Sequence, residues 1–294
     1  MKRIASLTAA LVLLLYGVAV AGDRPVTIDA FLAPSGRTWV IAHRGFSGSA
    51  PENTVAAIRE AIAIGADMAE IDVTLTADER VVVIHDETLD RTTNGSGKVA
   101  DRSFDDVRSL DAGSWFAPRF AGEKVPTLGE VLDTTNGRIL LNVEIKTEAV
   151  DRGISGWVAT AIRERGMVDQ VIVSSFSPTA LEQMHALAPE IRTAVLYNPE
   201  LQRGKGPVEI VHSLGASAFN IRGSRLKAKM LRSCRKQGIP VGVYTVDKPK
   251  RMKRWVKKEI NAIFTNHPDR LLEVLGEASA TATRPAPVPA VALP

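Results

Sequence analysis

Short apolar segments alternate with longer amphipathic segments through most of the chain, as strands and helices do in a parallel sheet. We predict eight strands, at residues 39–42, 68–74, 139–145, 171–175, 193–197, 217–221, 241–245 and 262–265. Eight parallel strands with intervening helices indicate an α/β fold, a (β/α)8 TIM barrel, whose active site lies at the carboxyl ends of the strands. The alternative is an open doubly wound sheet, but the chain has no Gly-x-Gly-x-x-Gly phosphate loop.

A ninth apolar segment, residues 81–84, lies close behind the strand at 68–74. A parallel crossover needs a dozen or more residues, so we predict an antiparallel hairpin. If the four residues 77–80 form its turn, Asp72 lies opposite His85. A shift of one residue breaks this pairing, because side chains alternate between the two faces.

Residues 87–125 follow the hairpin and do not continue the barrel pattern, being rich in Asp, Arg, Gly and Ser. A segment of this length in a compact domain is usually functional or a small subdomain. We therefore predict an insertion that lies over the barrel mouth next to His85. The alternative is a surface excursion without a role.

Residues that favour helix ends agree with the barrel pattern. We predict Asn53 as the N-cap of a helix and Gly65 as the stop at its carboxyl end. Thr127 and Glu130 have the spacing of a capping box, so another helix is expected to begin there.

Three acidic side chains are predicted to face the barrel interior. Strand alternation places Glu70 and Asp72 on one face of their strand, and Glu144 on one face of the next with Lys146. Carboxylates inside a strand are costly unless they are paired or bind a metal. One divalent cation, Ca²⁺ or Mg²⁺, would resolve their repulsion. The alternative is a buried ion network with Lys146 and Arg44.

Two histidines follow predicted strands and can reach the same opening. His43 follows the first strand, and His85 follows the hairpin arm. Two imidazoles in different protonation states can divide the work of general acid and general base in phosphodiester cleavage. Arg44 and Lys146 are placed to neutralise phosphate oxygens. The sequence does not assign the acid role to one histidine or the other.

The two ends of the chain differ from its middle. Residues 1–21 begin with Lys2 and Arg3 and continue through an apolar run to Ala-Val-Ala, a pattern typical of a secretory signal. We expect an exported protein, periplasmic or secreted; a membrane anchor is the alternative, although the run is shorter than the ~20 residues that span a bilayer. The predicted parts are a signal peptide at 1–21, a lead-in at 22–37, the barrel domain at 38–275 with its insertion at about 87–125, and a disordered tail at 276–294.

The net charge of +4 is unevenly distributed. Residues 201–258 contain 16 Lys or Arg against only Glu209 and Asp247. Such a segment can make weak contact with an anionic membrane surface, or it can be a set of solvated helix faces. Met252 and Trp255 recur at helical spacing among the basic residues, which favours the second interpretation. We expect no nucleic-acid partner.

Six short motifs occur in order along the chain: His43-Arg44-Gly45, Pro51-Glu52-Asn53-Thr54, Glu70-Ile71-Asp72-Val73, His85-Asp86, Pro126-Thr127-Leu128 and Glu144-Ile145-Lys146. This series resembles the glycerophosphodiester phosphodiesterase family, one of the phospholipase-C-like TIM-barrel phosphodiesterases, over roughly residues 38–272. A single tripeptide is a weak signal, but six ordered motifs are specific.

The resemblance implies metal-dependent hydrolysis of a small-molecule glycerophosphodiester to sn-glycerol 3-phosphate and an alcohol. By motif, it implies one role for each of three residue groups: Glu70, Asp72 and Glu144 hold the metal, His43 and His85 act as acid and base, and Arg44, Lys146, Phe176 and Tyr244 contact the substrate.

Two later motifs depart from the usual family wording. Where the family commonly has Trp-Thr-Val-Asn, the chain has Tyr244-Thr245-Val246-Asp247, and where it has Thr-Asp, the chain has Thr265-Asn266. We expect these positions to line the pocket and to affect head-group preference. Two other functions stay open: a phospholipase D-like or lysophospholipid-cleaving activity on the same barrel, and an exported protein that binds phosphodiesters without turnover.

Overall fold

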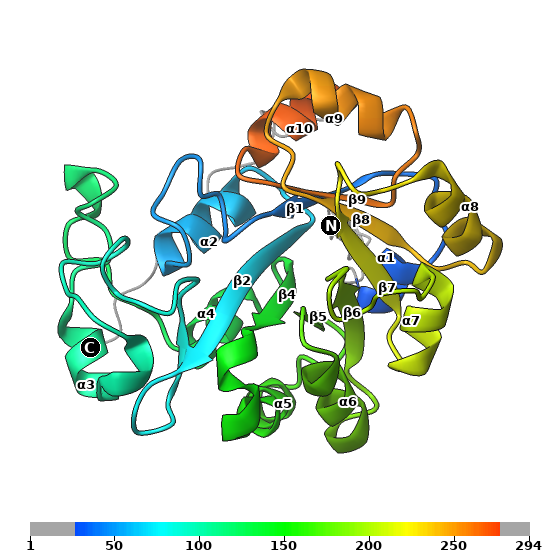
Figure 1. The fold of residues 1–294 in the computed structure, drawn as a ribbon. Helices are drawn as coiled ribbons and strands as arrows, with labels where there is room; N and C mark the ends of the chain where they lie inside the picture. Colours follow the sequence, from blue (N-terminus) through cyan, green and yellow to red (C-terminus); the bar gives the residue numbers. More distant parts are fainter. Residues whose placement is uncertain (1–26, 277–294) are drawn as a thin grey trace, which may run out of the picture.

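A closed parallel barrel forms the centre of the molecule (Figure 1). The computed structural model describes residues 27–276. Strand order is β1-β9-β8-β7-β6-β5-β4-β2-β3, and an additional pairing of β1 with β2 closes the ring. All pairings are parallel except that of β2 with β3. The strands are β1 Trp39–Ala42, β2 Met68–Leu75, β3 Val81–Val83, β4 Leu140–Ile145, β5 Val171–Ser175, β6 Arg192–Leu196, β7 Ala218–Arg222, β8 Val241–Tyr244 and β9 Ala262–Thr265. The predicted TIM barrel is confirmed.

Helices surround the barrel between its strands. They are α1 Ile28–Leu32, α2 Val55–Ala63, α3 Phe104–Ser109, α4 Leu128–Thr135, α5 Ile154–Glu164, α6 Pro178–Leu187, α7 Pro207–Ser213, α8 Ala228–Lys236, α9 Pro249–Val256 and α10 Pro268–Leu275, with short 3-10 turns η1 Val99–Asp101, η2 Pro118–Phe120 and η3 Thr147–Arg152. None of the helices in this part of the chain has the length and apolar character needed to cross a membrane. The predicted signal peptide and nearly all of the predicted tail lie outside the described residues.

Strand alternation divides the buried side chains into two sets. Outward-facing residues pack against the helices, while the inner set is apolar at the amino-terminal end of the barrel. The helix α1 contributes Ile28 and Phe31 to the inner set. The strand residues of this inner set are Trp39, Ile41, Met68, Leu140, Ile172, Ala194, Ala218, Ala262 and Phe264. Polar residues occupy the next inward positions on β2, β4, β5 and β7, namely Glu70, Asn142, Ser174 and Asn220.

The hairpin forms as predicted, but its register is shifted by one residue. Leu75 pairs with Val81, which places Ile84 opposite Asp72; the Ile84 N–H donates to the Asp72 carbonyl over 3.0 Å. The predicted pairing of Asp72 with His85 is therefore wrong. The Thr76 N–H donates to the Arg80 carbonyl over 3.1 Å, and the Arg80 N–H donates to Thr76 Oγ1 over 3.0 Å, so these two residues face each other. The turn therefore consists of residues 77–79, one fewer than the four that we assumed, and its last residue, Glu79, has a left-handed backbone with φ of +61°.

The helix ends agree with the sequence except at α2. The capping box of Thr127 and Glu130 is confirmed, and Gly65 follows α2 with φ of +77°. The N-cap of α2, however, is Thr54, whose Oγ1 accepts from the Ala57 N–H over 3.2 Å. Asn53 has a left-handed backbone with φ of +58°, and its side chain is used elsewhere.

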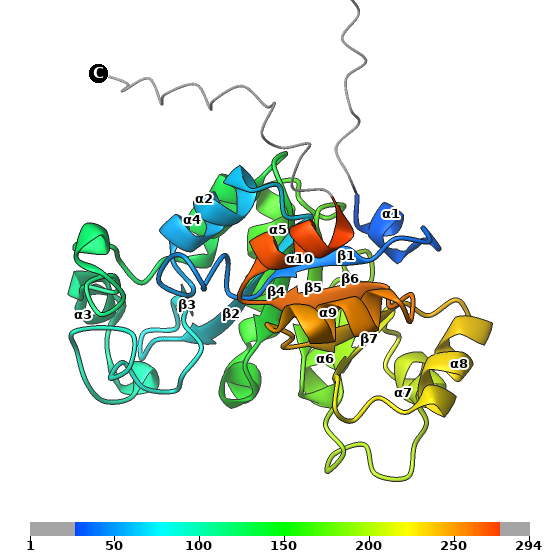
Figure 2. The same cartoon turned by 90° about the horizontal axis from the view of Figure 1, so that it is seen from above.

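Residues 87–125 form a compact unit at one side of the barrel, where α3 is labelled in Figure 2. The unit packs on the hairpin arm through a hydrophobic cluster of its own, which consists of Val82, Ile84, Leu89, Val99, Val107, Ala112 and Val125. Its attachment to β3 brings it next to His85, which follows that arm in the chain.

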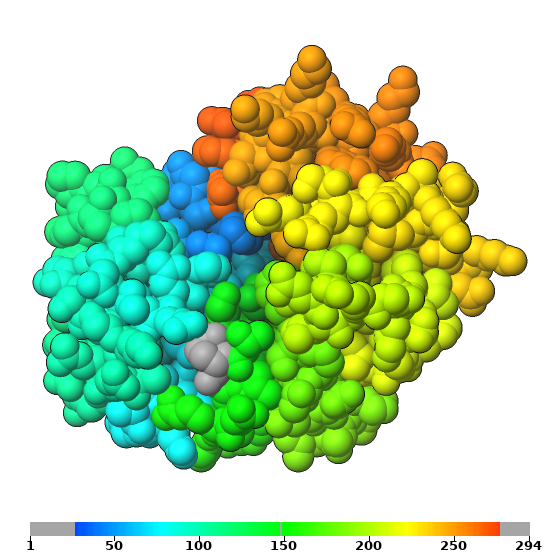
Figure 3. Space-filling model, viewed as in Figure 1, coloured from blue at the N-terminus to red at the C-terminus, as the bar shows by residue number. Residues whose placement is uncertain are grey.

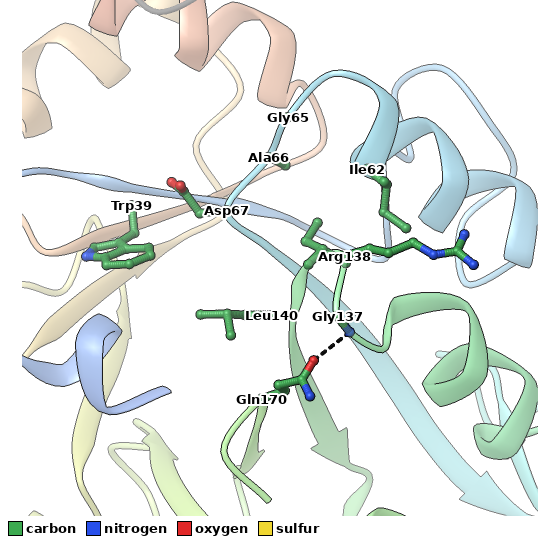
Figure 4. Close-up of a pocket in the computed structure, with 10 residues that line it drawn as sticks. Trp39, Ile62, Gly65, Ala66, Asp67, Gly137, Arg138, Leu140 and Gln170 are labelled. Atoms are coloured by element: carbon green, nitrogen blue, oxygen red, sulfur yellow. Dashed lines mark hydrogen bonds between the residues drawn. The ribbon is translucent and has the colours of Figure 1, made fainter. Parts of the chain in front are cut away.

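A cavity of about 200 Å³ lies at the amino-terminal end of the strands, among Trp39, Asp67, Leu140 and Gln170 (Figure 4). The only carboxylate in its lining, Asp67, is paired with Arg37. This end of a TIM barrel serves stability, whereas chemistry takes place at the opposite end.

Candidate active site

The structure brings the three predicted acidic residues together at the carboxyl-terminal end of the barrel. Glu70 and Asp72 lie on β2, and the register of the β2–β4 pair puts Asp72 beside Glu144. Each of the three offers a carboxylate oxygen within 4.8 Å of the others. Glu70 and Asp72 are buried, and only 12% of the Glu144 side chain is exposed.

Two cations face this cluster, so the ion network considered as the alternative is also present. Arg44 Nε lies 3.4 Å from Asp72 Oδ2. Lys146 Nζ lies 3.1 Å from Glu144 Oε1 and 3.6 Å from Asp72 Oδ1. Arg44 also pairs with Glu52 over 2.7 Å. The cations therefore do not balance the carboxylates, and a net negative charge is left in the cluster.

The pKa values reflect this excess of negative charge. Burial, together with the charge of Asp72, raises the pKa of Glu144 to about 7. Burial and the charges of Asp72 and Glu144 raise the pKa of Glu70 well above its usual range. Burial acts on Asp72 in the same direction, but Lys146 and Arg44 overcome it and lower its pKa. Buried oxygen donors that repel one another fit a hard divalent cation.

His43 follows β1 and is held by an amide. Its Nδ1 lies 2.7 Å from Asn266 Oδ1, and its Nε2 lies 4.0 Å from Glu70 Oε2. Asn266 Nδ2 donates to Asp247 Oδ2 over 3.0 Å, which fixes Oδ1 as the atom that faces the ring. An amide oxygen only accepts, so Nδ1 carries the proton and Nε2 presents a lone pair towards the acidic cluster. Burial, with the nearby Arg44, lowers the pKa of His43 to about 4.

His85 is held by a carboxylate instead. Its Nδ1 donates to Asp86 Oδ1 over 2.6 Å, and Asp86 Oδ2 accepts from Arg91 Nε over 2.6 Å. Hydrogen bonding to Arg91 holds the pKa of Asp86 well below its usual range. Arg91 also donates to both carboxylate oxygens of Glu52, over 2.7 and 2.8 Å. A continuous chain of ion pairs thus runs from Arg44 through Glu52, Arg91 and Asp86 to His85.

These groups surround a cavity of about 180 Å³ at the barrel mouth. In Figure 3 the same face is hollowed at its centre, between the cyan insertion and the yellow segment around β7. The cavity wall includes the predicted substrate residues Phe176 and Tyr244, whose ring centroids lie 6.0 Å apart in an edge-to-face arrangement. One wall is therefore aromatic, and the opposite wall carries the charged groups.

Residues 43–270 match the model of the Glycerophosphoryl diester phosphodiesterase family. The chain belongs to this family. A glycerophosphodiester phosphodiesterase from Caldanaerobacter subterraneus subsp. tengcongensis is 38% identical over 244 residues, which cover 81% of this chain and 98% of that protein. The chain is thus an enzyme of the glycerophosphodiester phosphodiesterase class.

Solved structures agree with this assignment. A glycerophosphodiester phosphodiesterase from Agrobacterium tumefaciens is 33% identical with a TM-score of 0.71, covering 80% of this chain and 99% of that one. An Oleispira antarctica phosphodiesterase, solved in complex with the product sn-glycerol-3-phosphate, is 28% identical with a TM-score of 0.73, covering 82% of this chain and 97% of that one.

Two positions where this phosphodiesterase departs from the usual family wording are connected to His43. We expected Asp247 and Asn266 to line the pocket, but neither lies in the wall of the cavity described above. They form the hydrogen-bond chain that orients His43. The usual Asn and Asp thus occur here in exchanged order. This reciprocal exchange was a signal in the sequence that the two side chains are partners.

Two residues support the phosphodiesterase site from the side, and sequence reasoning missed the role of the first, Asn53. Asn53, expected as a helix cap, donates from Nδ2 to Asp72 Oδ2 over 2.9 Å and accepts the Asp72 N–H over 3.1 Å. Gly45 has φ of +74°, and a Cβ there would lie 2.7 Å from Ala57. This close approach allows the Arg44 N–H to reach Glu70 Oε2 over 2.8 Å.

Proposed function

We propose that the enzyme hydrolyses glycerophosphodiesters to sn-glycerol 3-phosphate and an alcohol, in a reaction that depends on one divalent cation, Ca²⁺ or Mg²⁺. The observation that carries this proposal is the set of carboxylates of Glu70, Asp72 and Glu144 within 4.8 Å of one another, beside His43 and His85. The sn-glycerol-3-phosphate found in the Oleispira relative supports a small-molecule substrate with this product.

Glu70, Asp72 and Glu144 would hold the cation, which supplies positive charge to the nonbridging phosphate oxygens. Arg44, in the cavity wall, and Lys146, whose Nζ lies 3.1 Å from Glu144 Oε1, supply further positive charge beside the cluster. Nε of Arg44 makes no well-formed hydrogen bond among the described residues, but it lies 3.4 Å from Asp72 Oδ2, which holds this guanidinium against the acidic cluster.

The hydrogen-bond partners divide the roles of the two histidines. His43 donates to a neutral amide, which leaves Nε2 as a proton acceptor; we assign it as the general base. His85 donates to the Asp86 carboxylate, which stabilises an imidazolium; we assign it as the general acid for the leaving alkoxide. In the overall reaction water supplies a hydroxyl to phosphorus and a proton to the leaving alcohol.

The lining around the active-site cavity favours a glycerophosphodiester over a lysophospholipid. The cavity, of about 180 Å³, adjoins a second one that is lined by three arginines, and such a charged lining does not suit a long acyl chain. Comparing the hydrolysis of glycerophosphocholine and lysophosphatidylcholine tests this preference. A higher kcat/KM for the lysophospholipid would favour the alternative activity.

The proposal is tested by measuring glycerol 3-phosphate release from glycerophosphocholine with chelator and after re-addition of Ca²⁺ or Mg²⁺. We expect chelator to abolish turnover and one of the two cations to restore it. His43→Ala and His85→Ala should each reduce kcat at least about 10²-fold, as loss of a general acid or base does. His212→Ala on α7 is a matched control. Full activity in chelator, or near-normal turnover of either site variant, would refute the mechanism.

We also propose that residues 1–21 are a secretory signal and that the enzyme acts outside the cytoplasm. The support is the basic start, apolar run and Ala-Val-Ala ending of this segment. Amino-terminal sequencing of the protein recovered from the periplasm or medium should begin at Gly22. Recovery of the uncleaved chain in the membrane fraction would instead indicate an anchor.

A further inference from the structure

A second cavity, of about 500 Å³, lies beside the active-site cavity at the barrel mouth. The two cavities share three lining residues, Arg222 at the end of β7 and Tyr244 and Thr245 at the end of β8. We call the second cavity the arginine groove. Its remaining lining is Gly223, Ser224, Val246, Arg251, Arg254 and Trp255.

The charge of the arginine groove has one sign. Arg222, Arg251 and Arg254 line it, and no carboxylate does. The ion pairs within residues 27–276 include none of these three side chains, and all three are exposed. Guanidinium groups that are not neutralised by the protein are available to an anion, and their fork geometry matches the oxygens of a phosphate.

The floor of the groove is fixed by close packing between β7 and α9. A Cβ at Gly223 would lie 3.2 Å from the ring of Trp255, which is itself 6% exposed. The Gly223 N–H also donates to the Tyr244 carbonyl over 3.2 Å. Arg251 and Arg254 are three residues apart on α9 and therefore lie on the same side of that helix. The arginines are thus presented by two elements that pack directly on each other.

Tyr244 connects the groove to the acidic cluster. Its side chain lines both cavities, together with Glu144 in the wall of the active-site cavity and with Arg222 in the walls of both. A diester whose reacting phosphate lies at the cluster can extend past Tyr244 into the groove.

We propose that the arginine groove binds a second phosphate, carried by the leaving alcohol of the substrate. The inference rests on the proposed function, in which one half of the substrate is glycerol. Glycerol bears no further charge, so a second anionic group can come only from the alcohol half. The preferred substrates are then glycerophosphodiesters whose alcohol carries a phosphate.

The test compares glycerophosphoglycerol with the same diester phosphorylated on its leaving glycerol. We expect kcat/KM to be about tenfold higher for the phosphorylated diester at low ionic strength, and this preference to shrink as salt screens the groove. The double variant Arg251→Ala/Arg254→Ala should reduce the ratio of the two kcat/KM values to near one. Lys250→Ala/Lys253→Ala removes the same charge from α9 outside the groove lining and should keep the ratio.

Three results would overturn the proposal. The first is equal kcat/KM for both diesters, which leaves the proposed function intact. The second is a preference that both double variants lose equally. Such a result would mean that the overall positive charge of α9, and not binding in the groove, attracts the phosphorylated diester. The third is an unchanged ratio in Arg251→Ala/Arg254→Ala combined with lost sedimentation on anionic phosphatidylglycerol vesicles, which assigns the groove to a membrane surface.

If neither diester is cleaved, the proposed function fails separately. Calorimetric titration of the unmodified protein with the two intact diesters then tests the groove directly. Tighter binding of the phosphorylated diester, lost in Arg251→Ala/Arg254→Ala, supports the groove, and equal binding refutes it.

Discussion

The hydrogen-bond chain from Asp247 through Asn266 to His43 can be tested by exchanging its two members. In the native chain Asn266 Nδ2 donates to Asp247 over 3.0 Å, so Asn266 Oδ1 accepts from His43. Asp247→Asn places a second amide opposite the first. Two NH2 groups then face each other unless one amide turns. If Asn266 turns, its NH2 faces His43 Nδ1 and moves the ring proton to Nε2.

The loss of activity expected for Asp247→Asn can be estimated from the hydrogen bond that it breaks. Leaving a buried polar group unsatisfied costs about 1–3 kcal/mol. At about 1.4 kcal/mol per factor of ten, Asp247→Asn should lower kcat/KM about 5- to 150-fold. Asn266→Asp alone places two carboxylates about 3 Å apart, so we expect lower activity together with a lower Tm.

The double variant Asp247→Asn/Asn266→Asp restores a donor opposite an acceptor. We expect its kcat/KM to recover to within about fivefold of the native value, which corresponds to about 1 kcal/mol. Because His43 then faces a carboxylate, its pKa rises from about 4, and the acid limb of the rate profile moves to higher pH.

The assay is glycerol 3-phosphate release across pH, together with ¹⁵N chemical shifts of His43, which distinguish the two tautomers. Asp67→Asn is the control, because Asp67 also accepts two hydrogen bonds but lies at the opposite end of the barrel. It should lower Tm without changing kcat/KM. The reasoning is refuted if Asp247→Asn stays within twofold of the native rate, or if the double variant is no more active than the singles.

Three further predictions concern the metal site, the insertion and the turn after β1. In chelator, protons bound by Glu144, with its pKa of about 7, and by Glu70 stabilise the folded state and are lost as pH rises. The gain in Tm on adding excess cation should therefore grow from about pH 5.5 to about pH 8; a constant gain contradicts the raised pKa values. Arg91→Ala, which breaks the chain between Glu52 and Asp86, should lower kcat about tenfold, as loss of a supporting partner does, whereas Arg102→Ala in the same insertion should not. Gly45→Ala should destabilise by about 2–4 kcal/mol in chemical denaturation, because strain at positive φ adds to the contact with Ala57. Gly36→Ala, at φ of +66° in open space, should show only the smaller strain, and equal costs would refute the steric argument.

The barrel could be predicted from the sequence because each of its strands is short, apolar and bounded by a helix pattern. The predicted strand bounds differ from the observed ones by one residue at most. The hairpin register failed because the turn is one residue shorter than assumed: Thr76 faces Arg80, and Glu79 adopts a left-handed backbone, which is uncommon for a residue other than glycine. Asn53 was misassigned because the same amide that suits an N-cap also suits a left-handed residue that bonds to Asp72.

The acidic cluster could be predicted because period-two alternation fixes which side chains share a strand face. Its supports could not be derived in this way, since they join distant parts of the chain. His43 and Asn266 are 223 residues apart in sequence, and Arg91 and Glu52 are 39 apart. The arginine groove depends on how α9 lies against the end of β7, which no local pattern specifies.

The position of helix α1 determines how ligands enter and leave the enzyme. Ile28 and Phe31 pack beneath the inner apolar layer, so the acidic cluster can be reached only from the mouth. A cation held by this cluster, a substrate and both products would then share one route. A bound diester or a retained product at the mouth would obstruct the exit of such a cation. The enzyme should release its products before its metal, and chelator should strip the resting enzyme faster than the enzyme filled with glycerol 3-phosphate.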